Sequence, residues 1–293
     1  MIVVLAAMAA ATAAGLGLHA RAPDAATRVA ALCLRALLWV FVPFVVVVSL
    51  PRLHVDGGLA AGLAVGYVTA GATALAAYVI GARILRLPRA CTGTLIVAAL
   101  VMNATYMGYP FVGALLGSDD VPAAIAFDAL VNGPLFYVVG FAVGASFGGH
   151  DVPRREVLLR NPPLFAAIAG LALPASAIPH VLVNVSHGVV WVLLALGFVA
   201  LGVTLANEAR PELDRAVAVA VGLRVAFAPA LYLGLTALTG DVPTAFRIEE
   251  AMPVGINSLV VAHATGLDLR VASSAIAWST LVVAAWGLVA SLA

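Results

Sequence analysis

Apolar residues dominate the chain in long runs that short polar or turn-rich breaks separate. A helix needs about 20 apolar residues to cross a hydrocarbon core of about 30 Å. The pattern therefore predicts an all-α integral membrane protein with ten transmembrane helices. Their expected bounds are about 2–18, 29–50, 57–81, 91–117, 121–147, 163–178, 188–206, 214–239, 243–264 and 268–292.

The composition favours a membrane protein over a soluble one. Of 293 residues, 63% are hydrophobic and 10% are charged, whereas soluble domains carry about 25% charged residues. The net charge of +1 gives no reason to expect a nucleic-acid partner, and the lipid bilayer is the expected surrounding. Cys33 and Cys91 both lie in apolar runs and are interpreted as small buried hydrophobes rather than as a disulfide.

The arginines predict how the chain is oriented, because cations of short loops stay on the cytoplasmic side. With the N-terminus outside, only Arg52 and Arg247 fall in outer loops, while Arg35 and Arg224 fall within helices. We therefore expect a multi-pass protein of the plasma (inner) membrane with both termini outside. No cation precedes the first apolar run, so residues 1–18 are interpreted as a retained helix rather than a secretory signal. The inner loops hold Arg21, Arg28, Arg83, Arg86, Arg89, Arg154, Arg155, Arg160, Arg210, Arg215 and Arg270.

A basic stretch after residue 150 divides the predicted helices into two groups of five. Residues 1–150 and 151–293 are expected to form one five-helix repeat each. Because five is odd, the second repeat would enter the bilayer from the opposite face. This is the condition for the inverted repeats of secondary transporters.

The fourth and ninth predicted helices carry matching interruptions, Met102–Pro110 and Met252–Ser258. A proline inside a helix removes a backbone N–H and clashes with the carbonyl four residues back, and a nearby glycine allows unwinding. Unwound backbone is tolerated in a membrane only inside protein or beside water. We therefore expect these two helices to be broken and to cross at a central site. The alternative is that each is an ordinary kink.

The half-helices that begin after these interruptions would each present a partial positive charge of about +0.5. The side chains of Asn103 and Asn257 can hydrogen-bond a carboxylate without carrying a charge themselves. These features predict a binding site for a small organic anion. Its expected residues are Asn103, Gly108, Pro110, Pro253 and Asn257.

Two charged residues, Asp128 and Arg224, fall inside predicted spans at nearly matching depths. Charges within a bilayer are expensive unless they are paired or wetted. We predict that both lie near the site with Asn132, one turn beyond Asp128, either as ion-pair partners or with Asp128 taking up a coupling proton. A purely structural ion pair is an equal alternative. A solvated outer vestibule is the simplest interpretation of Glu249 and Glu250, with Arg247 close enough to pair with one of them.

Several short motifs, in order along nearly the whole chain, resemble the auxin efflux carrier family. They are Asn103–Pro110, Phe127-Asp128 with Asn132, Arg160–Pro163, Gly197 with Gly202–Leu205, Arg224 with Pro229, and Met252-Pro253 with Asn257. The resemblance implies two inverted five-helix repeats, with helices four and nine crossing at the substrate. It also implies a scaffold of helices one, two, six and seven, an elevator-like motion of the others, and organic anions such as malate or malonate as cargo.

This chain departs from the family pattern beside the first asparagine. The family commonly has glycine before this residue and Thr-Gly after it, where this chain has Met102, Ala104 and Thr105. The bulkier side chains, with Tyr106 and Tyr109 close by, bear on the identity of the substrate more than on the mechanism.

Other classes of function find less support in the residues. No His-Glu pair, paired intramembrane aspartates or serine-histidine arrangement stands at mid-depth, so no catalytic residues, metal site or cofactor are expected. Two matched broken helices favour a carrier over a channel or a receptor. Among carriers, the alternative is a sodium-coupled symporter of the bile-acid type, with cage oxygens from Asn103, Asn257, Glu249 and Ser258. A homodimer is left open as the oligomeric form.

Overall fold

The computed structural model describes residues 1–53, 56–150, 161–207 and 211–290, and within these ranges it contains helices and no β-strand. The all-α class is therefore confirmed. Seven helices of the described chain are long and apolar enough to cross a membrane. They are Ile2–Arg21, Pro23–Arg52, Gly57–Ile84, Ser118–Phe147, His180–Asn207, Arg215–Thr239 and Leu269–Ala290.

Some of these spans combine two labelled helices that a wider, π-type turn joins. The labelled helices are α1 (Ile2–Arg21), α2 (Pro23–Ala36) with α3 (Val42–Ser49), α4 (Gly57–Tyr78), α7 (Val121–Phe127) with α8 (Phe141–Phe147), α11 (His180–Asn207), α12 (Arg215–Gly222) with α13 (Ala228–Thr239), and α16 (Leu269–Ala290).

The three remaining predicted spans consist of shorter helices. The fourth is α5 (Arg89–Leu100) followed by α6 (Tyr109–Leu115), the sixth is α10 (Pro162–Ala172), and the ninth is α14 (Thr244–Glu250) followed by α15 (Asn257–Thr265). The predicted sixth helix is too long at its end, because Leu173 and Pro174 are extended and a short 3-10 turn follows at Ala175–Ala177. The predicted seventh helix is too short, since α11 already begins at His180.

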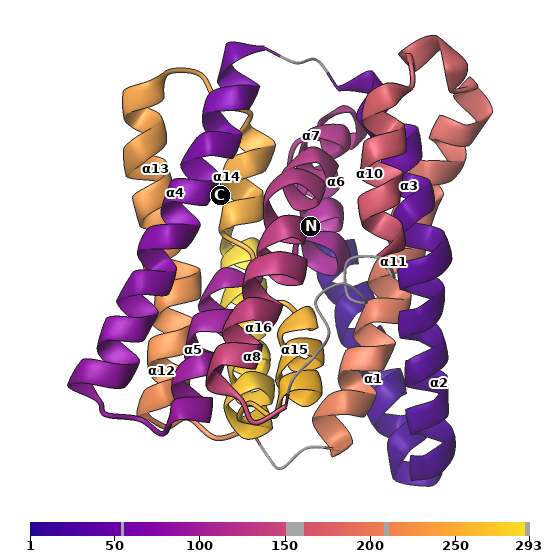
Figure 1. Ribbon diagram of the computed structural model, residues 1–293. Helices are drawn as coiled ribbons and strands as arrows, with labels where there is room; N and C mark the ends of the chain where they lie inside the picture. The colour runs from indigo at the N-terminus through magenta and orange to yellow at the C-terminus, as the bar shows by residue number, and fades with distance from the viewer. Residues whose placement is uncertain (54–55, 151–160, 208–210, 291–293) are drawn as a thin grey trace.

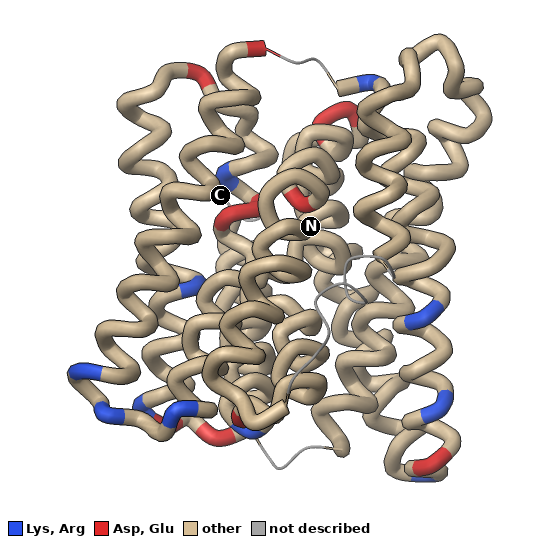
Figure 2. The backbone as a smooth tube through the Cα atoms, in the orientation of Figure 1, with Lys and Arg blue, Asp and Glu red and all other residues tan. Residues whose placement is uncertain are grey.

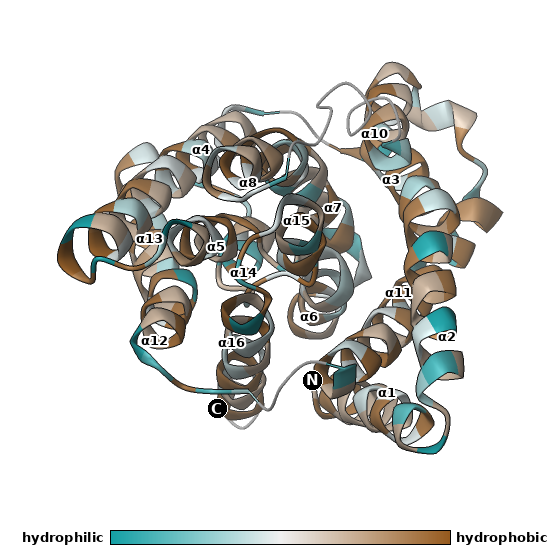
Figure 3. Cartoon of the chain, turned by 60° about the horizontal axis from the view of Figure 1, so that its bottom comes forward, coloured by the Kyte–Doolittle hydropathy of each residue, from teal (hydrophilic) through white to brown (hydrophobic). Residues whose placement is uncertain are grey.

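The helices form two groups that lie side by side (Figure 1 and Figure 3). One group, which we call the five-helix group, holds α1, α2, α3, α10 and α11, and it joins segments far apart in sequence, such as α1 with α11 and α3 with α10. We call the rest of the helices the crossing group, because it contains both predicted interruptions. The five-helix group corresponds to helices one, two, six and seven, which the family resemblance implies as a scaffold.

Within the five-helix group, α1 and α11 approach each other closely through two glycines. A Cβ atom added to Gly15 would lie 2.3 Å from the carbonyl oxygen of Val199, and one added to Gly202 would lie 2.3 Å from that of Thr12. Small residues allow transmembrane helices to come close enough for extensive van der Waals contact. This contact packs the two helices directly against each other.

Replacing Gly202 with alanine should lower the free energy of unfolding by about 1–3 kcal/mol, because the added methyl group forces the two backbones apart. The thermal midpoint should fall accordingly. Thermal unfolding of the purified protein in detergent, followed by tryptophan fluorescence, measures this change. Gly188→Ala on the same helix is the matched control, since nothing lies within 4 Å of a Cβ added there. Equal midpoints for the two variants would contradict the close approach of α1 and α11.

Most arginines of the described chain lie toward one end of the helices (Figure 2). At that end Arg270 forms ion pairs of 3.1 Å with Glu212 and 2.8 Å with Asp214. Arg247 was expected in an outer loop, but it lies on α14 and is half-buried. Arg154, Arg155, Arg160 and Arg210, which were assigned to inner loops, lie outside the described residues. The distribution is the one expected for a membrane protein, and the sidedness of the termini stays a prediction.

Candidate functional site

The two predicted interruptions meet inside the crossing group. The Asn103 N–H donates to the Pro253 carbonyl at 2.8 Å, and the Gly255 N–H donates to the Val101 carbonyl at 2.8 Å. These bonds form an isolated antiparallel bridge between Met102 and Val254. A Cβ atom at position 255 would lie 2.6 Å from the Met102 carbonyl oxygen, so this approach requires glycine. The two interruptions therefore face each other.

Two buried side chains bind the backbone groups that the interruptions leave exposed. The Met102 N–H donates to Asn132 Oδ1 at 3.1 Å, and Asn132 Nδ2 donates back to the Met102 carbonyl at 3.2 Å. In the second half, the Val254 N–H donates to Ser279 Oγ at 3.1 Å. Unpaired backbone groups are costly away from water. Asn132 and Ser279 therefore allow unwound backbone to persist at the crossing.

Arg224 binds the helix ends that lead into both interruptions. Its guanidinium is 1% exposed and donates to the carbonyl of Ala99 at 3.2 Å, to the carbonyl of Glu250, and to Glu250 Oε1 at 2.7 Å. Ala99 and Glu250 lie in the last turns of α5 and α14, where unpaired carbonyls carry a partial negative charge. One buried cation therefore compensates two helix C-termini and one carboxylate.

These contacts correct two expectations. Arg224 pairs with Glu250 and not with Asp128, because a matching depth in the membrane does not determine which way a side chain faces. Glu249 and Glu250 do not lie in a solvated vestibule, since their exposed fractions are 0% and 2%. No ion pair joins either glutamate to Arg247 in the part of the chain that the structure describes.

Asp128 lies at the centre of a separate hydrogen-bonded cluster. It begins the π-type turn Asp128–Asn132 and is 7% exposed. Its carboxylate accepts hydrogen bonds from the Thr105 hydroxyl, from the Tyr109 hydroxyl at 2.6 Å and from Asn132 Nδ2 at 2.7 Å. Charge-assisted hydrogen bonds of this kind are stronger than neutral ones. The cluster ties the turn after α7 to the first residues beyond the first interruption.

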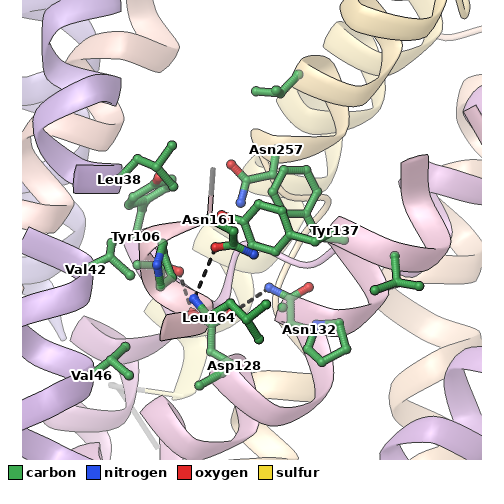
Figure 4. A pocket seen from close by; sticks show the side chains of 18 of the residues that line it. Leu38, Val42, Val46, Tyr106, Asp128, Asn132, Tyr137, Asn161, Leu164 and Asn257 are labelled. Carbon is green, nitrogen blue, oxygen red and sulfur yellow. Dashed lines mark hydrogen bonds between the residues drawn. The ribbon is translucent and has the colours of Figure 1, made fainter. Parts of the chain in front are cut away.

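A cavity of about 410 Å³ lies beside this cluster, between the five-helix group and the crossing group (Figure 4). Its wall is mainly aliphatic and aromatic with a few convergent polar groups, which is typical of small-molecule sites. Asp128 is the one charged side chain among the described lining residues. The five-helix group contributes Leu38, Val42, Val46, Asn161 and Leu164, and the crossing group contributes Tyr106, Asp128, Asn132, Tyr137 and Asn257.

The predicted residues take different positions relative to the cavity. Of the five predicted substrate residues, Asn257 lines it and the other four do not. Pro253 accepts a backbone hydrogen bond within the crossing. The Asn103 side chain is 2% exposed, and neither of its amide atoms has a hydrogen-bond partner among the described residues. Gly108 and Pro110 are buried around the start of α6. Asp128 and Asn132 line the cavity, whereas Arg224 lies away from it.

The sequence did not assign Asn161 or Tyr137 to the predicted site, although both line the cavity. Asn161 precedes α10, and its Oδ1 accepts the Leu164 N–H at 3.2 Å as an N-cap. An asparagine followed by proline is typical of a helix start, so the sequence indicates that a helix begins here. That this helix end faces the crossing depends on how the two groups pack, which local sequence does not reveal.

The chain is similar to known membrane transport proteins. Residues 152–289 match a family described as membrane transport protein. An uncharacterized transporter of Methanothermobacter thermautotrophicus is 26% identical over 197 residues, which cover 65% of this chain and 64% of that protein. An uncharacterized transporter of Methanocaldococcus jannaschii is 26% identical over 226 residues, which cover 72% of each chain. The matched region thus spans roughly two thirds of the length of these relatives.

Proposed function

We propose that this chain, which belongs to the auxin efflux carrier family of membrane transport proteins, is a secondary-active carrier of a small organic anion such as a mono- or dicarboxylate. The family indicates a transporter rather than an enzyme. The proposal includes ten spanning helices in two inverted repeats, and a plasma-membrane location with both termini outside. These points rest on the sequence pattern and the resemblance.

The meeting of two interrupted helices beside a cavity is the observation that carries the proposal. The cavity lies between two groups of helices, and both groups contribute to its wall. Asn257 is the first residue of α15, where the helix dipole favours a negative charge. The amide of Asn257 would bind the carboxylate of the anion, and the apolar side chains of α2 and α3 would contact its body. The Asp128 cluster would hold this wall in place.

Transport would follow an elevator-type cycle. The five-helix group would stay fixed in the membrane, and the crossing group would slide against it with the anion bound. Arg224 and Asn132 contact the interruptions entirely within the crossing group, so the site would move as one unit. Alternating access requires this integrity, because the site itself must not open to both sides at once.

Replacing Asn257 with alanine should reduce uptake of radiolabelled malonate into proteoliposomes about ten- to hundredfold. A hydrogen bond to a charged group contributes about 1.5–3 kcal/mol, and each 1.4 kcal/mol is a tenfold effect. Asn184→Ala is the control, because Asn184 is exposed on α11. A thermal-shift screen of dicarboxylates and aromatic acids selects a better substrate if malonate is weak. Absence of saturable uptake for every acid would refute the proposed function, and wild-type uptake by the variant would remove Asn257 from the site.

A further inference from the structure

Two consecutive glutamates at the end of α14 have opposite surroundings. Both are buried, with exposed fractions of 0% for Glu249 and 2% for Glu250. Glu250 has the guanidinium of Arg224 at 2.7 Å. Neither carboxyl oxygen of Glu249 has a hydrogen-bond partner within the described residues. Glu249 is therefore a fully buried acid that lacks the compensation given to its neighbour.

The carboxyl group of Glu249 packs directly on the backbone of Gly108. A Cβ atom added to Gly108 would lie 2.3 Å from Oε2 and 2.5 Å from Oε1. The contact leaves no space between the acid and the start of α6. Glu249 is 0% exposed and does not line the cavity that Asp128 lines, so its site is closed in this arrangement.

Among the described residues, none forms an ion pair that would give Glu249 a positive partner. The carboxylates of Asp128 and Glu250 are close enough to repel a negative charge on Glu249. The elements packed against α14 are α6, α7, α13 and the turn Ala104–Gly108, and their titratable side chains are the phenols Tyr106, Tyr109 and Tyr232. Arg224 is engaged by Glu250 and by backbone carbonyls. Arg247, two residues away on α14, forms no ion pair with Glu249 in the described chain.

An ionised carboxylate is strongly unfavourable in such a place. Burial without a partner removes its hydration, and two neighbouring carboxylates and the negative end of α14 repel it. A neutral carboxylic acid avoids the charge-dependent part of this penalty, which is the largest part. Asp128 differs, because three donors bind its carboxylate. When the surroundings of two neighbouring acids favour opposite protonation states, they indicate which acid holds the proton. Here they favour a protonated Glu249 and an ionised Asp128.

We infer that Glu249 is a proton-binding site, that it is protonated in the closed arrangement seen here, and that this proton is the coupling ion of the carrier. The inference rests on the proposed function. A proton from water on one side binds the Glu249 carboxylate, and the same proton leaves to water on the other side. The crossing group can pass through the closed arrangement only when Glu249 is neutral. Movement of the anion is thereby coupled to movement of a proton. In this proposal Glu249, rather than Asp128, binds the coupling proton.

Infrared difference spectroscopy of the reconstituted protein tests the protonation directly. At neutral pH, the spectrum of the wild type minus that of Glu249→Gln should contain the C=O stretching band of a protonated carboxylic acid. The difference between the wild type and Asp128→Asn should lack this band. A band that is lost in Asp128→Asn and kept in Glu249→Gln would overturn the inference. This measurement needs no transported substrate, so it is independent of the proposed function.

Stability supplies a second readout with a neighbouring control. Glu249→Gln replaces a neutral acid with a neutral amide of the same shape, so the thermal midpoint should stay near that of the wild type. Glu250→Gln removes the partner of Arg224 and should lower the midpoint. Equal destabilisation by the two changes, or failure of Glu249→Gln to fold, would contradict a neutral Glu249. Stabilisation of the wild type by sodium over choline that Glu249→Gln abolishes would assign the site to sodium instead.

Transport provides the third readout. An inward proton gradient should accelerate malonate uptake by the wild type, and uptake by Glu249→Gln should not respond to the gradient. A variant that responds as the wild type does would show that the proton is carried elsewhere. If the wild type takes up no organic acid at all, the proposed function fails, while the infrared result still decides whether Glu249 binds a proton.

Discussion

Replacing Arg224 with glutamine should destabilise the folded protein by about 3–5 kcal/mol, the range measured when one partner of a buried ion pair is removed. The change leaves the Glu250 carboxylate buried without a cation and weakens the contacts to the carbonyls of Ala99 and Glu250. Both interruptions should become disordered together, because Arg224 binds the helix that leads into each. We expect little folded protein and no uptake.

The fraction of folded protein and its thermal midpoint, measured by fluorescence-detected gel filtration, quantify this effect. Arg35→Gln is the control, because Arg35 is exposed on α2. The double variant Arg224→Gln with Glu250→Gln should recover part of the loss, since no unpaired charge remains. A wild-type midpoint for Arg224→Gln alone would mean that the helix ends at the crossing do not need the guanidinium.

Replacing Asn132 with alanine should be nearly as damaging, because a single amide supports the first interruption. The change removes both hydrogen bonds to Met102 and one donor to Asp128. Each buried polar group left without a partner costs about 1–3 kcal/mol. The backbone at Met102 should then lose its fixed geometry, and malonate uptake should fall below detection even where folded protein is recovered.

The second interruption provides the matched comparison. Ser279→Ala removes one hydrogen bond to the interruption, from the Val254 N–H, and one to the Ile276 carbonyl within α16, whereas Asn132→Ala removes three hydrogen bonds, two of them to the interruption. The loss of stability should therefore be clearly smaller for the serine variant. Equal losses would indicate that the Asn132 amide does not hold the first interruption, and that the bridge between Met102 and Val254 persists without it.

The sequence predicted the two interruptions because each of them is caused by residues that lie close together in the chain. Pro110 and Pro253 each remove a backbone donor, and the glycine near each permits unwinding, so both positions could be read from residue types. Asp128, Asn132 and Asn257, which line the cavity, were also selected from the sequence. They are polar residues inside predicted membrane spans, where polar side chains are costly. These parts of the prediction depend on residue type and spacing alone.

The partners of the buried charges could not be predicted in the same way. Counting residues along a helix gives the depth of Asp128 and of Arg224, but not the direction in which either side chain points. Both lie in π-type turns, Asp128–Asn132 and Leu223–Phe227, which change the rotation expected for a regular helix. Glu249 and Glu250 were assigned to a solvated outer vestibule, with Arg247 close enough in sequence to pair with one of them. Burial of the end of α14 against α6 is a tertiary effect.

The π-type turn at Asp128–Asn132 has a further consequence for the span that contains it. Successive residues of an α-helix are about 100° apart around the axis, and a π-type turn holds one extra residue. The segment that follows is therefore rotated relative to a continuous α-helix, so that Tyr137 lines the cavity while Val139, which is 37% exposed, is not part of its wall. Shortening this turn by one residue would rotate the segment that follows it by about 100° around the helix axis. The length of the turn, rather than the polarity of the residues after it, therefore decides which side chains line the cavity.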